Sequence, residues 1–116
     1  MKPETAKRLL DAERACQELR TFTANTEKSA YLNDRGLMLI VQKLIEIVGE
    51  ALRQAEITDP NLSDHIPDLR QIIGTRNRTI HLYAEVDYAL LWDIVQAEIP
   101  MLQLRLQELL EHAPDP

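Results

Sequence analysis

The 116-residue sequence has little cysteine, glycine or aromatic character: one cysteine, three glycines, and 4% Phe, Trp and Tyr. The single Cys16 excludes an intramolecular disulfide and a metal cluster built on several cysteines, and it is typical of a reducing, cytoplasmic protein. Three glycines supply little of the turn chemistry that an all-β fold needs. No stretch approaches the roughly 18 consecutive apolar residues of a membrane span, and charges run through the N-terminus in place of a signal core. We therefore expect no membrane association and no export.

Apolar residues nevertheless make up 45% of the chain. With few aromatics, the core must be built from Leu, Ile, Val and Ala, which favours packed helices. The length suits one domain, since domains typically have roughly 100–200 residues. We expect a single domain over residues 1–116, with a frayed tail at 112–116. The net charge of −6, from 13 Lys and Arg against 19 Asp and Glu, argues against a general nucleic-acid coat protein.

Apolar periodicity predicts an amphipathic helix from Pro3 to about Phe22. A polar connection follows over residues 21–26, in which Asn25 or Thr26 is available to cap the next helix. That second helix is expected to be the longest, with an apolar stripe of Leu37, Val41, Leu44, Val48, Ala51 and Ala55. Ile40 and Ile47 widen its apolar arc beyond what one neighbour needs, so an oligomer could use the surplus.

Residues 57–67 contain two prolines with Asp, Asn and Ser, and are predicted to form a loop. A short third helix begins near Pro67 and ends around residues 83–86. Asp87 is expected to cap a fourth helix that continues to the end of the chain, bent at Pro100 because proline lacks the amide proton for an intrahelical bond. Tyr88 and Trp92 lie on its apolar stripe, as core or interface residues. The predicted fold class is all-α, an antiparallel bundle of four to five helices.

The segment Leu69–Ala84 (LRQIIGTRNRTIHLYA) differs from the rest of the chain in charge, because it contains no acid. It holds Arg70, Arg76, Arg78 and His81. Arginine presents a planar donor fork to phosphate oxygens, and a neutral imidazole can accept a proton from a ribose 2′-hydroxyl near neutral pH. Arginine can also stabilise the charge that develops on a phosphorane. The segment is therefore a candidate phosphodiester-cleaving site.

Several sequence patterns, in the expected order, resemble the HEPN superfamily in the form carried by HepT-like toxins. Residues 76–83 (RNRTIHLY) match R-N-x-x-x-H-x-Y. Residues 47–51 (IVGEA) are similar to the family's I-[IV]-G-E-A stretch, and residues 74–77 (GTRN) to its G-x-R-N. Residues 86–95 (VDYALLWDIV) are similar to V-D-x-x-x-x-W-x-[IV]-[IV]. The resemblance covers roughly residues 5–110 and departs from the usual pattern at Thr75 and Arg78, which are more polar than is common there.

The resemblance implies an all-helical homodimer whose two motifs face one cleft, and a metal-independent RNA endonuclease without cofactor that uses an R-x4-H-x-Y motif. Arg76 and His81 would be catalytic and Asn77 and Tyr83 supporting, with no metal ligand. The acid-free segment itself makes Arg70 and Arg78 candidate phosphate contacts. The resemblance further implies the toxin of a bacterial, type VII-like toxin–antitoxin pair. Its partner would be a minimal nucleotidyltransferase antitoxin that neutralises the toxin by AMPylation of Tyr83.

Helix geometry bears on the predicted site independently of the resemblance. Arg76 and His81 are five residues apart and point about 140° away from each other on an ideal helix, so one straight helix does not aim both at one phosphate. Either the helix ends or loosens between them, or Arg and His from two copies meet across a twofold axis. Asn77 lies one turn before His81 and could fix its tautomer.

Other interpretations remain open at this level. The chain could be a non-catalytic helical partner or substrate-binding subunit of a nucleotidyltransferase, with Tyr83 only as the acceptor, or a structural subunit without chemistry. Arg70 could pair with Asp68 or another acid, and Tyr83 could simply pack. Cys16 is interpreted as a small buried hydrophobic residue, and Glu46 and Glu50 as the solvated edge of the second helix.

Overall fold

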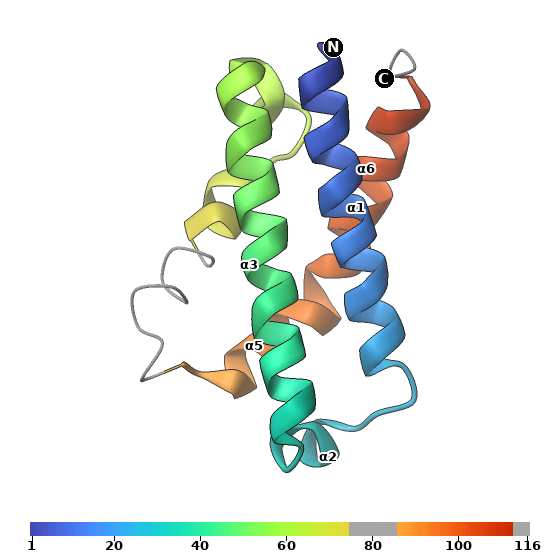
Figure 1. Cartoon of the computed structure of the whole chain (residues 1–116), viewed down its shortest axis with the longest axis vertical. Helices are drawn as coiled ribbons and strands as arrows, with labels where there is room; N and C mark the ends of the chain where they lie inside the picture. Colours follow the sequence, from blue (N-terminus) through green and yellow to red (C-terminus); the bar gives the residue numbers. More distant parts are fainter. Residues whose placement is uncertain (75–85, 113–116) are drawn as a thin grey trace.

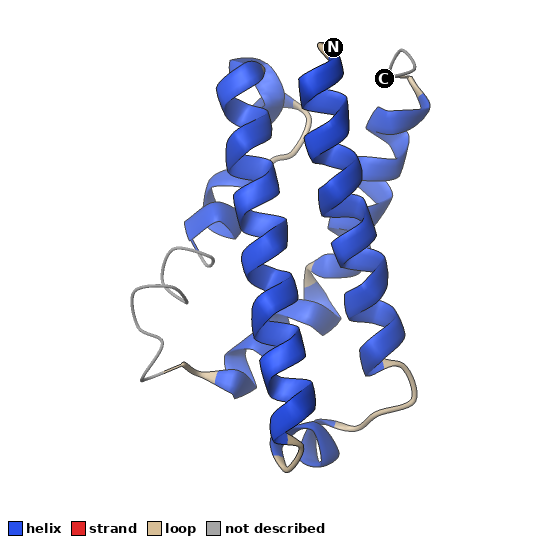
Figure 2. Cartoon of the chain, in the orientation of Figure 1, coloured by secondary structure: helices blue, strands red, loops and turns tan. Residues whose placement is uncertain are grey.

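The structure, a computed structural model, describes residues 1–74 and 86–112. In these ranges the chain is helical, without a β-strand, as the composition predicts (Figure 2). Two long helices, α1 (Pro3–Thr23) and α3 (Arg35–Thr58), lie side by side along the molecule, and α6 (Ile99–Glu111) packs along α1 (Figure 1). The shorter α5 (Tyr88–Ala97) and α2 (Lys28–Leu32) lie toward the end of the bundle where α1 ends and α3 begins (Figure 1).

Helix α1 runs antiparallel to both long neighbours. Near its start, the hydroxyl of Thr5 is hydrogen-bonded to that of Thr58 at the end of α3. On its α6 side, Arg20 donates to Gln103 across 2.8 Å, and one turn of α6 later Gln107 donates to Glu13 across 3.2 Å. The Gln103 side chain, 1% exposed, also donates to Gln17 and Glu13, so burial of this amide is compensated by hydrogen bonds.

The core is aliphatic apart from one aromatic pair. The apolar stripe predicted for α1 is buried, and so are the α3 positions Val41, Leu44, Val48, Ala51 and Ala55. Ile40 and Ile47 are each 36% exposed, which agrees with an apolar arc wider than the bundle itself covers. Trp92 is a core residue, packed on the buried ring of Tyr31 with 4.8 Å between ring centroids.

Two predictions for the chain after α1 were wrong: the cap at Asn25 or Thr26, and the expectation that the second helix is the longest. Neither Asn25 nor Thr26 caps the next helix; Asn25 adopts a left-handed conformation (φ 59°), which asparagine tolerates better than most residues. The next helix is the short α2, which follows Glu27 without a side-chain cap. The long helix begins only at Arg35, capped by Asp34, which accepts a 3.0 Å hydrogen bond from the Leu37 amide.

The predicted loop over 57–67 is partly helical. Helix α3 continues to Thr58, and Pro60–Asp64 forms the 3₁₀ helix η1, capped by Asp59. Proline is well tolerated at the first position of a helix, so the prolines of this segment do not exclude helical turns. The third helix begins at residue 69 and is described as far as residue 74.

The last predicted helix is two helices rather than one bent helix. Asp87 caps α5 as expected, accepting from the Leu90 amide at 3.0 Å. Helix α5 ends at Ala97, and α6 starts at Ile99 with Pro100 in its first turn. Proline removes a backbone donor and obstructs the preceding turn, so the chain changes direction here. Of the tail predicted to fray, His112 follows α6 and residues 113–116 lie outside the described residues.

Candidate functional site

Four motif residues and one candidate phosphate contact lie outside the described residues: Arg76, Asn77, His81 and Tyr83, and Arg78. Their mutual geometry, including the predicted separation of Arg76 from His81, therefore stays a prediction. What the structure does describe is the chain immediately before and after them, at residues 69–74 and 86–88.

The chain before the motif is held by apolar packing. Leu69 is fully buried and Ile73 is 8% exposed. Ile72 lies with Ile45 and Val48 of α3 around a small apolar space. This stretch is thus fixed against the middle of α3 before the motif begins.

The chain after the motif is held by polar contacts as well as packing. The Tyr88 hydroxyl donates to Gln42 Oε1 of α3 across 2.8 Å, and the Tyr31 hydroxyl donates to the Tyr88 carbonyl across 2.8 Å. Burial, with Tyr88 and Asp87 nearby, raises the pKa of the Tyr31 hydroxyl, so it stays a neutral donor. The sequence did not predict this chain of hydrogen bonds, because Tyr31 stands in a polar stretch far from Tyr88 in sequence. The described chain on both sides of residues 75–85 therefore contacts α3, through Ile72 before these residues and through Tyr88 after them. Figure 1 shows the yellow ribbon and the start of the orange α5 beside the green α3.

Arg70, the one candidate phosphate contact in the described part, pairs with Glu56 rather than Asp68. Its Nη2 lies 3.5 Å from Glu56 Oε1, and its side chain is 83% exposed. Such an exposed ion pair contributes little to stability, so Arg70 can exchange Glu56 for another anion, such as a phosphate.

Glu50 is not merely a solvated edge of α3. Its carboxylate accepts from Arg53 at 2.9 and 3.1 Å and from Gln54 at 3.0 Å. The hydrogen bonds and charge of Glu50 raise the pKa of the Arg53 guanidinium above its ordinary value. Glu46, half-buried, lines the groove between α1 and α3.

The remaining candidate groups of the described chain show no sign of chemistry. Cys16 is fully buried in the core, and burial raises its pKa to about 12, which confirms its interpretation as a small hydrophobic residue. His65 and His112 share one open hollow with Asp64, Arg105 and Glu108. Within residues 1–74 and 86–112, no three His, Cys, Asp or Glu side chains form a group that could hold a metal ion. No helix in the same ranges is long and apolar enough to cross a membrane.

The described helices and the order of the sequence patterns are those of a class of small all-helical proteins, and comparison with known proteins defines the family. The family model described as "HepT-like: Ribonuclease HepT-like" matches residues 12–109. The chain belongs to this HepT-like ribonuclease family of the HEPN superfamily.

Three relatives illustrate the match. A protein of Thermococcus cleftensis named "Probable ribonuclease HepT" is 30% identical over 101 residues, covering 87% of this chain and 91% of the relative. Two proteins of Methanocaldococcus jannaschii, each named "Putative RNase", are 28% and 27% identical, covering 78% and 85% of this chain and 74% and 90% of the relatives. No solved structure matches. The chain is thus similar, over most of its length, to proteins named as ribonucleases.

Proposed function

We propose that this protein is a metal-independent endoribonuclease that acts as a homodimer. The observation that carries the proposal is the family match over residues 12–109, which includes the whole R-N-x-x-x-H-x-Y motif and links it to relatives named as ribonucleases. The attachment of both ends of the motif segment to α3 supports it, since a catalytic segment must be held in position.

The proposed reaction is transesterification at an RNA phosphodiester. The ribose 2′-oxygen attacks the adjacent phosphorus while His81 accepts its proton, and the bond from phosphorus to the 5′-oxygen breaks. Arg76 stabilises the charge on the phosphorane, and Asn77 orients the imidazole of His81. The leaving 5′-oxygen needs a proton from an acid, and His81 of the second copy supplies it in a twofold site. The products are a 2′,3′-cyclic phosphate and a 5′-hydroxyl.

Replacement of His81 tests the catalytic assignment. We expect His81→Ala to lower RNA cleavage by at least about a hundredfold, because general acid–base catalysis contributes that much or more. Cleavage is measured on a fluorescent RNA in the presence of EDTA, with circular dichroism to verify the fold. His112→Ala removes an exposed histidine beyond the motif and is the matched control. Equal cleavage by His81→Ala and His112→Ala would remove His81 from the mechanism.

We further propose that the protein is the toxin of a toxin–antitoxin pair and that a nucleotidyltransferase neutralises it at Tyr83. The Tyr83 oxygen attacks the α-phosphate of ATP, a phosphodiester forms, and pyrophosphate leaves. The added negative charge beside Arg76 and Arg78 would oppose binding of an RNA phosphate.

Coexpression with the adjacent reading frame tests this regulation. We expect the intact mass to increase by one or more AMP units, the modified protein to lose RNA cleavage, and Tyr83→Phe to abolish the mass increase. Tandem mass spectrometry should place the added AMP on Tyr83 and on neither Tyr31 nor Tyr88, whose hydroxyls are hydrogen-bonded in the fold. An unchanged mass with an active nucleotidyltransferase would contradict neutralisation by AMPylation.

The alternative is a non-catalytic partner of a nucleotidyltransferase, which the acidic net charge of −6 favours. Expression of the protein alone distinguishes the two. Growth arrest that Arg76→Ala abolishes would contradict the non-catalytic alternative, whereas normal growth and no RNA cleavage by the purified protein would support it.

A further inference from the structure

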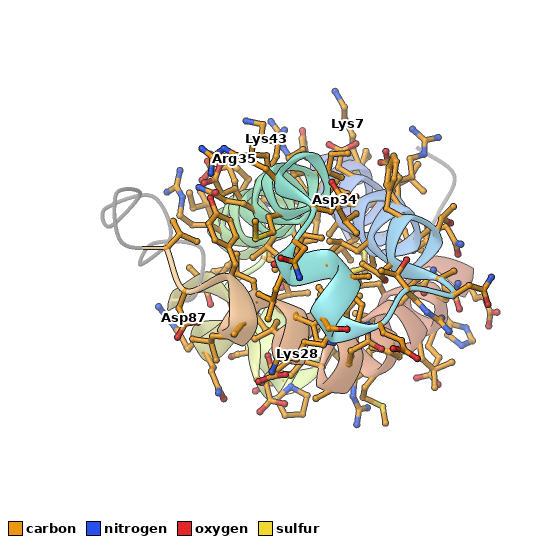
Figure 3. All side chains as sticks on the ribbon, turned by 90° about the horizontal axis from the view of Figure 1, so that it is seen from below. Lys7, Lys28, Asp34, Arg35, Lys43 and Asp87 are labelled. Carbon is orange, nitrogen blue, oxygen red and sulfur yellow. The ribbon has the colours of Figure 1, made fainter. Side chains whose placement is uncertain are left out.

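Tyr88, the first residue of α5, is held at two atoms by two other helices. Its hydroxyl donates to Gln42 Oε1 of α3 across 2.8 Å, and its backbone carbonyl accepts from the Tyr31 hydroxyl of α2 across 2.8 Å. One contact fixes the side chain and the other fixes the main chain. Figure 3 views this end of the bundle and shows Asp87, the cap residue just before Tyr88, at the side of the molecule beside α5. The two contacts therefore fix the point at which the chain enters α5.

The contact from α2 uses a buried hydroxyl. Tyr31 is 0% exposed, and its ring packs on Trp92. A phenylalanine would make the same ring contact without the cost of removing a hydroxyl from water. The bond to the Tyr88 carbonyl compensates this cost, and burial raises the pKa of the Tyr31 hydroxyl, so that it stays a donor. Tyr31 thus contributes to the position of residue 88 as well as to the core.

The contacts of Tyr88 differ in kind from those of the chain before residue 75. There, Ile72 lies with Ile45 and Val48 of α3 around a small apolar space. Apolar contacts have no preferred direction, so such a surface tolerates small shifts. A hydrogen bond requires a donor–acceptor distance of about 2.7–3.2 Å and a nearly straight angle. Tyr88 therefore sets the position of the chain more exactly than Ile72 does.

The two places where the chain contacts α3 are close together on that helix. Gln42 precedes Val48 by six residues, which corresponds to about 9 Å along the helix axis. Tyr88 follows His81 by only seven residues, so a displacement of Tyr88 has little intervening chain to absorb it. A misplacement of about 1 Å can lower catalysis by about a hundredfold. The position of Tyr88 can thus influence the reaction without any contact with RNA.

We propose that Tyr88 is a positioning residue of the ribonuclease: Gln42 and Tyr31 hold it, and it sets the position of the chain that carries His81. The assignment rests on the proposed function and adds to it three residues outside the R-N-x-x-x-H-x-Y motif. In this role Tyr88 acts through His81 and not on the RNA itself.

Removal of the bond between Tyr88 and Gln42 tests the role kinetically. Tyr88→Phe removes the donor and Gln42→Leu the acceptor, each with little change of volume. We expect each to lower kcat of RNA cleavage by at least about tenfold and to leave KM within about twofold, because positioning acts on the chemical step. The double variant should lose no more than the more impaired single variant, since both remove the same contact. Gln42→Glu, which keeps an acceptor oxygen at the same side-chain length, should retain most of the activity.

Two control variants remove contacts of the same helices that do not involve Tyr88. Thr5→Val removes a buried hydroxyl bonded to Thr58 at the other end of α3, and Lys28→Ala removes the exposed ion pair with Asp93 between α2 and α5. Both should leave kcat unchanged well below the melting temperature, which thermal denaturation determines for every variant. Unchanged kcat in both Tyr88→Phe and Gln42→Leu, or an equal loss in Thr5→Val, would overturn the inference.

Proton NMR tests the same inference without RNA. The chain has three histidines, and His81→Ala identifies the ring signal of His81. We expect this signal to shift in Tyr88→Phe and in Gln42→Leu but not in Thr5→Val, while the other two histidine signals stay in place. A His81 signal that moves in neither variant would overturn the role of Tyr88. A signal that moves in a protein whose wild type cleaves no RNA would contradict the proposed function and leave the positioning by Tyr88 supported.

Discussion

At the scale of single residues, burial decides what each reactive group does. Cys16 has the nucleophilic atom but not the exposure that activates a thiol. Its pKa is raised to about 12, by desolvation first and by Glu13 second, and the opposing charge of Arg20 is too weak to reverse this. Arg70 is in the opposite situation, since its side chain is 83% exposed and makes a single 3.5 Å ion pair within residues 1–74 and 86–112. The sequence identified both groups, but only their surroundings distinguish an inert group from an available one.

The buried thiol gives a pH-dependent prediction. The folded-state pKa of Cys16 is raised above its unfolded value, so its contribution to stability is present below about pH 9 and is lost as pH rises toward about 12. Chemical denaturation followed by circular dichroism should show falling stability in this window, and Cys16→Ala should lose less over the same range. The Tyr31 hydroxyl, whose pKa is also raised, contributes in the same direction.

Thiol labelling gives a second measurement of the same feature. At pH 8 the native protein should react with a thiol reagent at least about a hundredfold more slowly than the protein in denaturant, because reaction requires opening of the core. Equal rates would show that Cys16 is accessible in the folded protein.

At the scale of elements, helix ends determine how the motif segment is held. Asp34 and Asp87 both cap helices with 3.0 Å hydrogen bonds, but only Asp87 stands directly after the segment. The same local chemistry therefore has two consequences: Asp34 starts α3, and Asp87 with Tyr88 fixes where the motif segment ends.

Replacement of the two caps separates stability from positioning. Asp34→Ala and Asp87→Ala should each lower the free energy of unfolding by about 1 kcal/mol, the usual loss for a removed N-cap, and Asp87→Asn should retain most of it. Well below the melting temperature, RNA cleavage should fall for Asp87→Ala and remain unchanged for Asp34→Ala. An equal effect of both alanine variants on cleavage would argue against a positioning role for Asp87.

At the scale of the whole molecule, the average charge conceals two regions of different composition. The net charge of −6 combines an acid-free segment with a groove that carries both signs. The acid-free segment suits a narrow phosphate site. An acidic protein can thus act on RNA if contact is confined to a few phosphates.

The salt dependence of RNA binding measures this confinement. For single-stranded RNA, each neutralised phosphate contributes about −0.7 to the slope of log K against log salt concentration. Contacts from Arg70, Arg76 and Arg78 alone predict a slope of about −2 for one copy and about −4 for both. Fluorescence anisotropy with the His81→Ala protein measures it without cleavage, and a much steeper slope would mean that cations outside the segment bind the RNA.

The sequence by itself determined the all-helical class, the stripes of α1 and α3, the Asp87 cap and the family, because periodicity, capping residues and motif order are local properties of the chain. Tertiary structure decided what depends on distant partners. It extended α3 to Thr58, paired Arg70 with Glu56, and joined Tyr31, Tyr88 and Gln42 across three helices. These outcomes depend on which surfaces meet and which polar groups are buried together, and such contacts join residues far apart in the sequence, where no local pattern records them.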